Sequence, residues 1–299
     1  MSFETTQVAA ASLSILRVAG EDRASFVHNY CTADIKKLNP NQYTEAFFLN
    51  HKGKTVCHGF VIARDADLLI VTTAKSIEEL LAGLDRYLIS SDVQFSDATA
   101  LWSASFVFGQ GSESALAACD VSPPTGNTVL NLGFRLALQA ELAGEGFLVL
   151  DPAAGNSSLA DQLIEKGATR VSAEQFERTR IENQTPWCDS EITDACLPQE
   201  FRRDEKAISF TKGCYLGQET VARLDALGHV NRYFVGFEVS NGTLAVGDRL
   251  LKDEKKVGLV TSLAEGADGH ATGLGFVRVA LSTPGETIDL DGGLQIKLR

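Results

Sequence analysis

The pattern of apolar residues changes near residue 230, and this change constrains the fold more than any other feature of the sequence. Upstream, apolar runs of strand length, such as residues 43–49 and 56–63, alternate with segments of helical period such as 77–88. Downstream, four short β-runs alternate with Gly/Asp turns, and no helical period appears. Closely spaced short strands of this kind are typical of a small barrel. The sequence therefore predicts an α+β body over residues 1–228 and a C-terminal β-barrel domain over residues 229–299.

The body shows several local signals for strands and helix starts. Ser76 with Glu79, and Ser172 with Gln175, have the spacing of a capping box. A short helix over 158–166 is expected to stop at Gly167, because glycine suits the position after a helix. The apolar runs predict strands over 12–18, 43–49, 56–63, 68–73, 102–108, 133–139 and 146–150, with 56–63 and 68–73 forming a hairpin.

Charge and hydropathy exclude two classes of partner. The chain carries 27 basic and 39 acidic residues, a formal charge of −12, whereas proteins that grip a phosphate backbone rely on Lys/Arg stripes. We therefore expect no direct nucleic-acid binding. No stretch approaches about 20 uninterrupted apolar residues, so no membrane span is expected. The first residues lack the basic n-region of a secretory signal, which predicts a cytoplasmic protein.

The six cysteines do not form a recognisable framework. None are two residues apart, so reduced thiols are expected, and the spacing does not suit a resident iron–sulfur cluster. His28 with Cys31, and Cys57 with His58, offer metal-ligand types, but neighbours in a strand point to opposite faces. We therefore expect no bound metal.

The most unusual local sequence is Lys212-Gly213-Cys214-Tyr215-Leu216-Gly217-Gln218-Glu219, followed by Thr220-Val221-Ala222-Arg223. Glycines on both sides of the Cys-Tyr pair permit a sharp turn and close approach of the backbone to a ligand. A helix from about residue 216 would put Cys214 near a helix N-terminus, where the macrodipole and Lys212 would favour the thiolate. A buried structural cysteine is the alternative interpretation, and local chemistry alone does not decide between them.

This segment resembles the K-G-C-Y-x-G-Q-E signature of the YgfZ family, folate-binding relatives of the glycine-cleavage T-protein. The match is unbroken from Lys212 to Glu219. Further similar pieces are Arg180-Ile181-Glu182, Leu197-Pro198-Gln199-Glu200 and Gly228-His229-Val230-Asn231-Arg232. The resemblance implies a ferredoxin-like, T-protein-type folate-binding body around a central cavity, with a small C-terminal β-barrel.

The resemblance also implies roles for individual residues. Cys214 would be the reactive or ligand-contacting group, and Lys212, Gly213, Tyr215, Gly217, Gln218 and Glu219 would shape its loop. Glu182 would bind the pterin of tetrahydrofolate or a folate derivative, since a carboxylate accepts hydrogen bonds from an amino-pyrimidine edge. Arg223 or Arg232 would pair with the glutamate tail of the folate. The implied function is the assembly or repair of 4Fe–4S enzymes, including tRNA-modifying ones, with iron–sulfur clients or assembly proteins as partners.

One departure bears on activity. Aminomethyltransferases carry a pair of aspartates where this chain has Cys57 and His58, and an imidazole does not replace a low-pKa carboxylate beside a folate amine. Glycine-cleavage activity is therefore not expected. A folate-dependent one-carbon transferase and a non-catalytic docking scaffold remain alternative functions.

Overall fold

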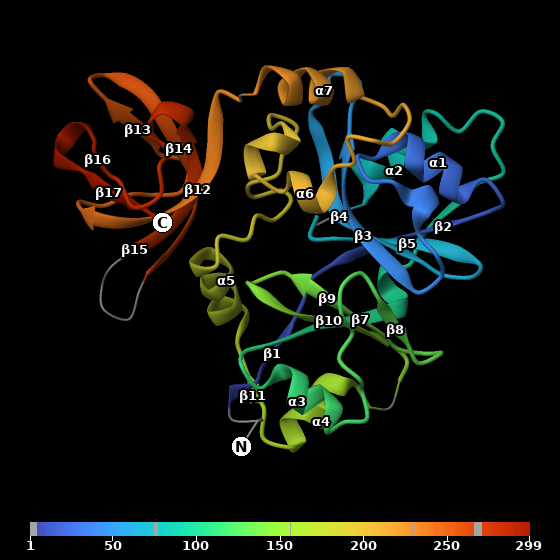
Figure 1. Cartoon of the computed structure of the whole chain (residues 1–299). Coiled ribbons are helices and arrows are strands. Elements are labelled where there is room, and N and C mark those ends of the chain that lie inside the picture. Colours follow the sequence, from blue (N-terminus) through green and yellow to red (C-terminus); the bar gives the residue numbers. More distant parts are fainter. Residues whose placement is uncertain (1–4, 75–76, 156, 229, 266–270) are drawn as a thin grey trace.

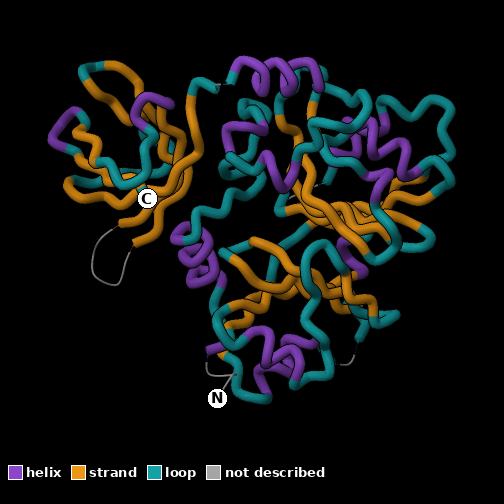
Figure 2. Tube along the Cα trace, in the orientation of Figure 1, coloured by secondary structure: helices purple, strands orange, loops and turns teal. Residues whose placement is uncertain are grey.

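Three β-sheets form three lobes around a central helical region (Figure 1). The computed structural model describes residues 5–74, 77–155, 157–228, 230–265 and 271–299. In that part of the chain, no helix combines the length and the apolar character that crossing a membrane requires. Figure 2 shows strands in all three lobes, with helices and loops between the lobes.

Sheet I is antiparallel, with the strand order β3-β4-β5-β2-β6. The lobe built on this sheet contains β2 (Ser14–Ala19), α1 (Arg23–Tyr30), a 3-10 helix (Ile35–Lys37), β3 (Gln42–Leu49), β4 (Thr55–Ala63), β5 (Asp67–Thr72), α2 (Glu78–Asp85) and β6 (Gln94–Asp97). Phe26 of α1 and Leu80 of α2 pack with Val61 on one face, while Phe60 and Ile62 on the other face pack against sheet II. The alternation of these residues along β4 is what a strand buried on both faces requires.

Sheet II has the order β11-β1-β7-β10-β9-β8, with β1 and β11 parallel. The lobe built on this sheet contains β1 (Gln7–Ala10), a 3-10 helix (Thr99–Leu101), β7 (Trp102–Phe108), α3 (Ser112–Ala117), β8 (Val129–Asn131), β9 (Leu136–Glu141), β10 (Glu145–Pro152), α4 (Leu159–Glu165) and β11 (Thr169–Arg170). Leu116 of α3 and Leu163 of α4 cover its outer face, where they pack on Val107 and Val149.

Sheet III is a six-stranded antiparallel sheet with the order β13-β14-β15-β12-β17-β16. The lobe built on this sheet contains β12 (Arg232–Asn241), β13 (Arg249–Lys252), β14 (Lys255–Glu265), β15 (Ala271–Arg278), a 3-10 helix (Val279–Leu281), β16 (Thr287–Asp289), a 3-10 helix (Asp291–Gly293) and β17 (Gln295–Leu298). The sheet curls on itself in Figure 1, and no ladder joins β13 to β16 within the described residues. The predicted C-terminal β unit is confirmed as an open, curled sheet; the exact domain boundary at 228/229 stays a prediction.

Four helices lie between the sheets: α5 (Ala173–Glu182), η4 (Pro198–Phe201), α6 (Asp204–Ala207) and α7 (Gln218–Leu227). The capping box of Ser172 and Gln175 at the start of α5 is confirmed. The helix predicted over 77–88 is α2, but the capping residue Ser76 lies outside the described residues, as does His229.

A buried ion pair joins these central helices to sheet III. Arg180 of α5 is 1% exposed and donates from Nη1 to Glu191 Oε2 at 2.9 Å and to the Thr185 carbonyl at 2.8 Å. Its Nη2 donates to Ser262 Oγ on β14 at 3.0 Å, and Ser262 donates to Glu191 Oε1 at 2.5 Å. Glu177 accepts from the remaining guanidinium donors. The charges are compensated within the interior, as buried ions require.

We expect Arg180→Met to destabilise the protein strongly, because Glu191 is 1% exposed and would lose its cation. Breaking one partner of a buried pair costs about 3–5 kcal/mol. Urea unfolding followed by fluorescence measures this change in the free energy of unfolding. Arg178→Met is the matched control, because Arg178 pairs with Glu182 on the exposed side of the same helix, where such pairs contribute under about 1 kcal/mol. Equal losses for the two variants would refute the importance of the buried pair.

Candidate functional site

The loop that carries the sequence motif is anchored to the end of α1 by Lys212. The Lys212 side chain is buried, and its Nζ donates to the carbonyl oxygens of His28 at 2.5 Å, Cys31 at 2.8 Å and Ala33 at 2.8 Å. Burial lowers the pKa of Lys212. Carbonyls at the end of a helix lack partners within the helix, and an ammonium group there satisfies them. Lys212 thus fixes the start of the loop to sheet I.

Tyr215 to Gly217 fix the other side of the loop. The buried Tyr215 ring lies 4.7 Å from Lys212 Nζ, and burial raises the pKa of Tyr215 to about 12. The amide of Leu216 donates to the Asn29 carbonyl at 2.9 Å. Gly217 has φ +80°, and a Cβ there would lie 2.8 Å from both Asn50 O and Gly53 Cα in the β3–β4 turn. A glycine is therefore required at this position.

Between these anchors the thiol of Cys214 is exposed. The alternative of a buried structural cysteine is wrong. Helix α7 begins at Gln218, with Glu219 in its first turn, so Cys214 lies four residues ahead of the helix rather than at its N-terminus. Three carbonyls accept from the Lys212 ammonium, which serves the end of α1. The loop therefore presents an exposed thiol on a fixed backbone. Stabilisation of the thiolate by Lys212 and the helix dipole stays a prediction.

The predicted folate contacts lie apart from one another. Glu182 stands at the end of α5, where its carboxylate pairs with Arg178 at 2.7 Å and is 41% exposed. Arg223 is exposed on α7. Arg232 begins β12, pairs with Glu200 at 3.0 Å, and lies 4.2 Å from the centre of the Phe276 ring. None of the three lines any of the five most pronounced pockets in the described part of the chain, and their folate-binding roles stay predictions.

A buried charged cluster that the sequence analysis did not identify lies in the centre. Glu45 of β3 accepts two hydrogen bonds from Arg203, at 2.9 and 2.7 Å, and lies 3.2 Å from His58 Nε2 on β4. Burial by itself would raise the pKa of Glu45, but the hydrogen bonds from His58 and Arg203 outweigh it and hold that pKa well below its usual range. A single acid within the apolar run 43–49 was the available signal.

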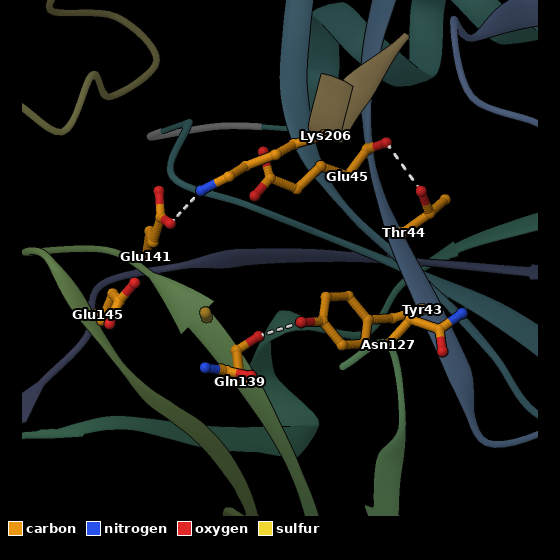
Figure 3. A pocket seen from close by; sticks show the side chains of 9 residues that line it. Tyr43, Thr44, Glu45, Asn127, Gln139, Glu141, Glu145 and Lys206 are labelled. Carbon is orange, nitrogen blue, oxygen red and sulfur yellow. Dashed lines mark hydrogen bonds and ion pairs between the residues drawn. The ribbon is translucent and has the colours of Figure 1, made fainter. Parts of the chain in front are cut away.

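Beside this cluster a pocket of about 350 Å³ opens between sheet I, sheet II and α6 (Figure 3). Its polar lining includes Tyr43, Glu45, Gln139, Glu141, Glu145 and Lys206. The Tyr43 hydroxyl donates to the Gln139 carbonyl at 2.5 Å, and Lys206 forms an ion pair with Glu141. Within the described residues, the carboxylate of Glu145 has no hydrogen-bonding or ionic partner in the structure. Acidic and basic side chains thus face a pocket between two lobes, and such interfaces are a common location for ligand sites.

A second pocket of about 350 Å³ lies within the lobe built on sheet I, next to the motif loop. It is lined by Leu216, by residues of α2 and the β3–β4 turn, and by Tyr30 and Tyr87, whose rings stack at 4.9 Å. Cys214 lines neither this pocket nor the pocket between sheet I and sheet II.

Cys57 and His58 do not form a metal site with Cys31 and His28. His58 pairs with Glu45, and His28 pairs with Asp34 at 3.2 Å. Within the described residues, no group of three or more His, Cys, Asp or Glu side chains is placed to hold a metal ion. Glu45, however, supplies a carboxylate beside His58. It comes from the neighbouring strand, and Arg203 and His58 occupy it.

Comparisons with known proteins agree with this architecture. Residues 6–202, which are 197 of the 299 residues, match the family model of the GCVT N-terminal domain. The chain is similar to the glycine cleavage system aminomethyltransferase T from Bartonella henselae, with a TM-score of 0.85 and 16% identity over 100% of this chain and 86% of that one. At this identity the likeness establishes the fold.

Two sequence relatives are more similar in sequence. A putative chloroplastic transferase of Arabidopsis thaliana, At1g60990, is 28% identical over 91% of this chain, which spans 65% of that protein, just under two thirds. The tRNA-modifying protein YgfZ of Yersinia pseudotuberculosis serotype IB (strain PB1/+) is 27% identical over 88% of this chain and 82% of its own length. The predicted resemblance to YgfZ is confirmed. Because the family model covers about two thirds of the sequence and the fold matches along its whole length, the chain belongs to the GCVT N-terminal domain family.

Proposed function

We propose that this chain is a cytoplasmic YgfZ-type protein that binds a reduced folate and supports the assembly or repair of 4Fe–4S enzymes, including tRNA-modifying ones. The observation that carries the proposal is the exposed thiol of Cys214 on a loop fixed at both sides. The curated relatives named YgfZ support the link to tRNA modification. The iron–sulfur role is supported by the intact motif around Cys214 and its resemblance to the YgfZ family.

The loop suits a reaction between proteins rather than chemistry in a closed cavity. A thiol must be accessible to react, and Cys214 is exposed while its neighbours Lys212 and Tyr215 are buried. The fixed backbone holds the thiol in one place, which lowers the entropic cost of engaging a partner. With a formal charge of −12, the chain is poorly suited to bind tRNA itself, so we assign the partner as an iron–sulfur protein.

We assign the folate to the pocket between sheet I and sheet II in Figure 3. Glu145 has a carboxylate that can accept hydrogen bonds from the amino-pyrimidine edge of a pterin, and Lys206 can attract the carboxylates of the glutamate tail. The resemblance assigns the pterin to Glu182 instead, but that residue lies at the exposed end of α5 and lines none of the pockets described above. Variants of the two glutamates distinguish these assignments.

Aminomethyl transfer is not favoured. Cys57 and His58 stand where the transferases carry aspartates, and the nearby carboxylate of Glu45 is held by Arg203 and His58. The low pKa of Glu45 leaves it a weak base. A non-catalytic docking scaffold differs from our proposal in requiring neither folate nor the Cys214 thiol.

We expect Cys214→Ser to abolish function in a strain that lacks its own YgfZ-type protein. The readouts are the activity of a 4Fe–4S dehydratase under oxidative stress and the content of modified nucleosides in tRNA. The wild-type chain should restore both, and Cys214→Ser should leave both at the level of the deletion strain, because serine cannot supply a thiolate. Cys119→Ser is the control, since Cys119 is partly exposed and outside the motif. Full restoration by Cys214→Ser, at equal protein level, would contradict the proposal.

We expect Glu145→Gln and Lys206→Met each to weaken tetrahydrofolate binding by about tenfold to a hundredfold, because a hydrogen bond to a charged group contributes roughly 1.5–3 kcal/mol. Isothermal titration calorimetry of the purified protein measures this change in Kd. Glu182→Gln should leave the Kd unchanged. The opposite pattern would move the pterin to the end of α5, and the absence of binding by the wild-type chain would favour the scaffold.

A further inference from the structure

Two buried cysteines far apart in the sequence lie against the same two oxygen atoms. Cys57 Sγ of β4 is 3.1 Å from Thr72 Oγ1 and 3.5 Å from the His58 carbonyl oxygen. Cys188 Sγ, in the loop after α5, is 3.6 Å from Thr72 Oγ1 and 3.4 Å from the same carbonyl. Thr72 Oγ1 itself donates to that carbonyl at 2.7 Å. The two sulfurs are therefore neighbours.

The surroundings make the two thiols unequal. The amide of His58 donates to Cys188 Sγ at 3.4 Å, and the interaction with the Cys57 thiol lowers the pKa of Cys188 below its usual value. The same interaction, together with burial, raises the pKa of Cys57. A thiolate is the nucleophile in thiol oxidation, so Cys188 is the residue that reacts first.

A small cavity lies beside this pair, although neither sulfur lines it. It is lined by His58, Thr72 and Trp187, which lie next to or in contact with the thiols, and its volume is about 10 Å³. This is room for about one water-sized molecule. Hydrogen peroxide is larger than water, so it reaches the two sulfurs when this part of the structure opens locally.

We propose that Cys57 and Cys188 are a redox-active pair, which hydrogen peroxide converts into a disulfide between β4 and the loop after α5. The Cys188 thiolate attacks one peroxide oxygen, the O–O bond breaks, and the released hydroxide takes a proton to become water. The sulfenic acid on Cys188 is then attacked by the sulfur of Cys57. The S–S bond forms, the S–O bond breaks, and the hydroxide leaves as water with the proton of Cys57. In total two thiols and one peroxide give one disulfide and two waters.

The disulfide would tie sheet I to the segment that holds Glu191, the buried partner of Arg180. It would therefore restrict movement of sheet III relative to the body of the protein. This role is independent of the folate pocket and of Cys214, and it goes beyond the proposed function.

Mass spectrometry of the full chain tests the proposal directly. The starting protein carries Cys214→Ser, which removes the exposed thiol and the disulfides that it would form between molecules. It is treated with hydrogen peroxide, its free thiols are alkylated under denaturing conditions, and it is digested without reduction. We expect a cross-linked peptide pair joining Cys57 to Cys188, lost on treatment with dithiothreitol. Cys31 is the internal control, because it is buried beside the Ala33 carbonyl and burial raises its pKa to about 11; it should remain alkylated.

A second variant tests the order of the steps. With Cys57→Ser in the same background, peroxide should leave a sulfenic acid on Cys188, which dimedone traps once the protein is denatured in its presence. The proposal is overturned if peroxide leaves Cys57 and Cys188 both free for alkylation, or if either pairs with another cysteine. The first sample retains both native cysteines, so these overturning results do not depend on the folding of the Cys57 variant.

Discussion

The buried guanidinium of Arg180 is the interaction on which the arrangement of the three lobes depends. It binds Glu177 within α5, Glu191 in the following loop and Ser262 on β14, so one side chain joins the central helix, the central loop and sheet III. The loop held in this way carries Trp187, whose indole donates to the Leu142 carbonyl of sheet II at 3.0 Å. The interface between lobes, where the candidate folate pocket lies, is thus shaped by polar contacts that require complete pairing to be tolerated in the interior.

The motif loop depends on a second set of long-range contacts. Lys212 donates to three carbonyls in the last turn of α1 and just after it, and Gly217 fits against the β3–β4 turn where a side chain would collide. Most of the motif therefore builds the loop, and Cys214 is the member that the loop exposes. The proposed reactive thiol and the proposed folate pocket are separate parts of the molecule, which agrees with a protein that acts on partner proteins rather than on a bound small substrate.

Local sequence signals predicted local structure well. Apolar alternation gave β4 and β5 and their hairpin, and the capping box at Ser172 marked the start of α5, because these depend on neighbours in sequence. Short strands such as β1 and β6 were not predicted, since pairing with a sheet rather than a pattern of their own makes them strands. The site was harder still. Arg180 and Glu182 are two residues apart on a helix and point to nearly opposite sides, so the sequence could not tell which of them is buried. The pairs Glu45–Arg203 and Cys57–Cys188 join residues more than a hundred positions apart, and only the fold brings them together.

The separation of thiol and folate pocket is tested most directly by a crystal structure of the protein with tetrahydrofolate. We expect pterin density between β3 and β10, with the amino-pyrimidine edge on Glu145, the glutamate tail toward Lys206, and no ligand atom in contact with Cys214. Density in the pocket of Tyr30 and Tyr87 beside the motif loop, or against Glu182, would contradict this separation.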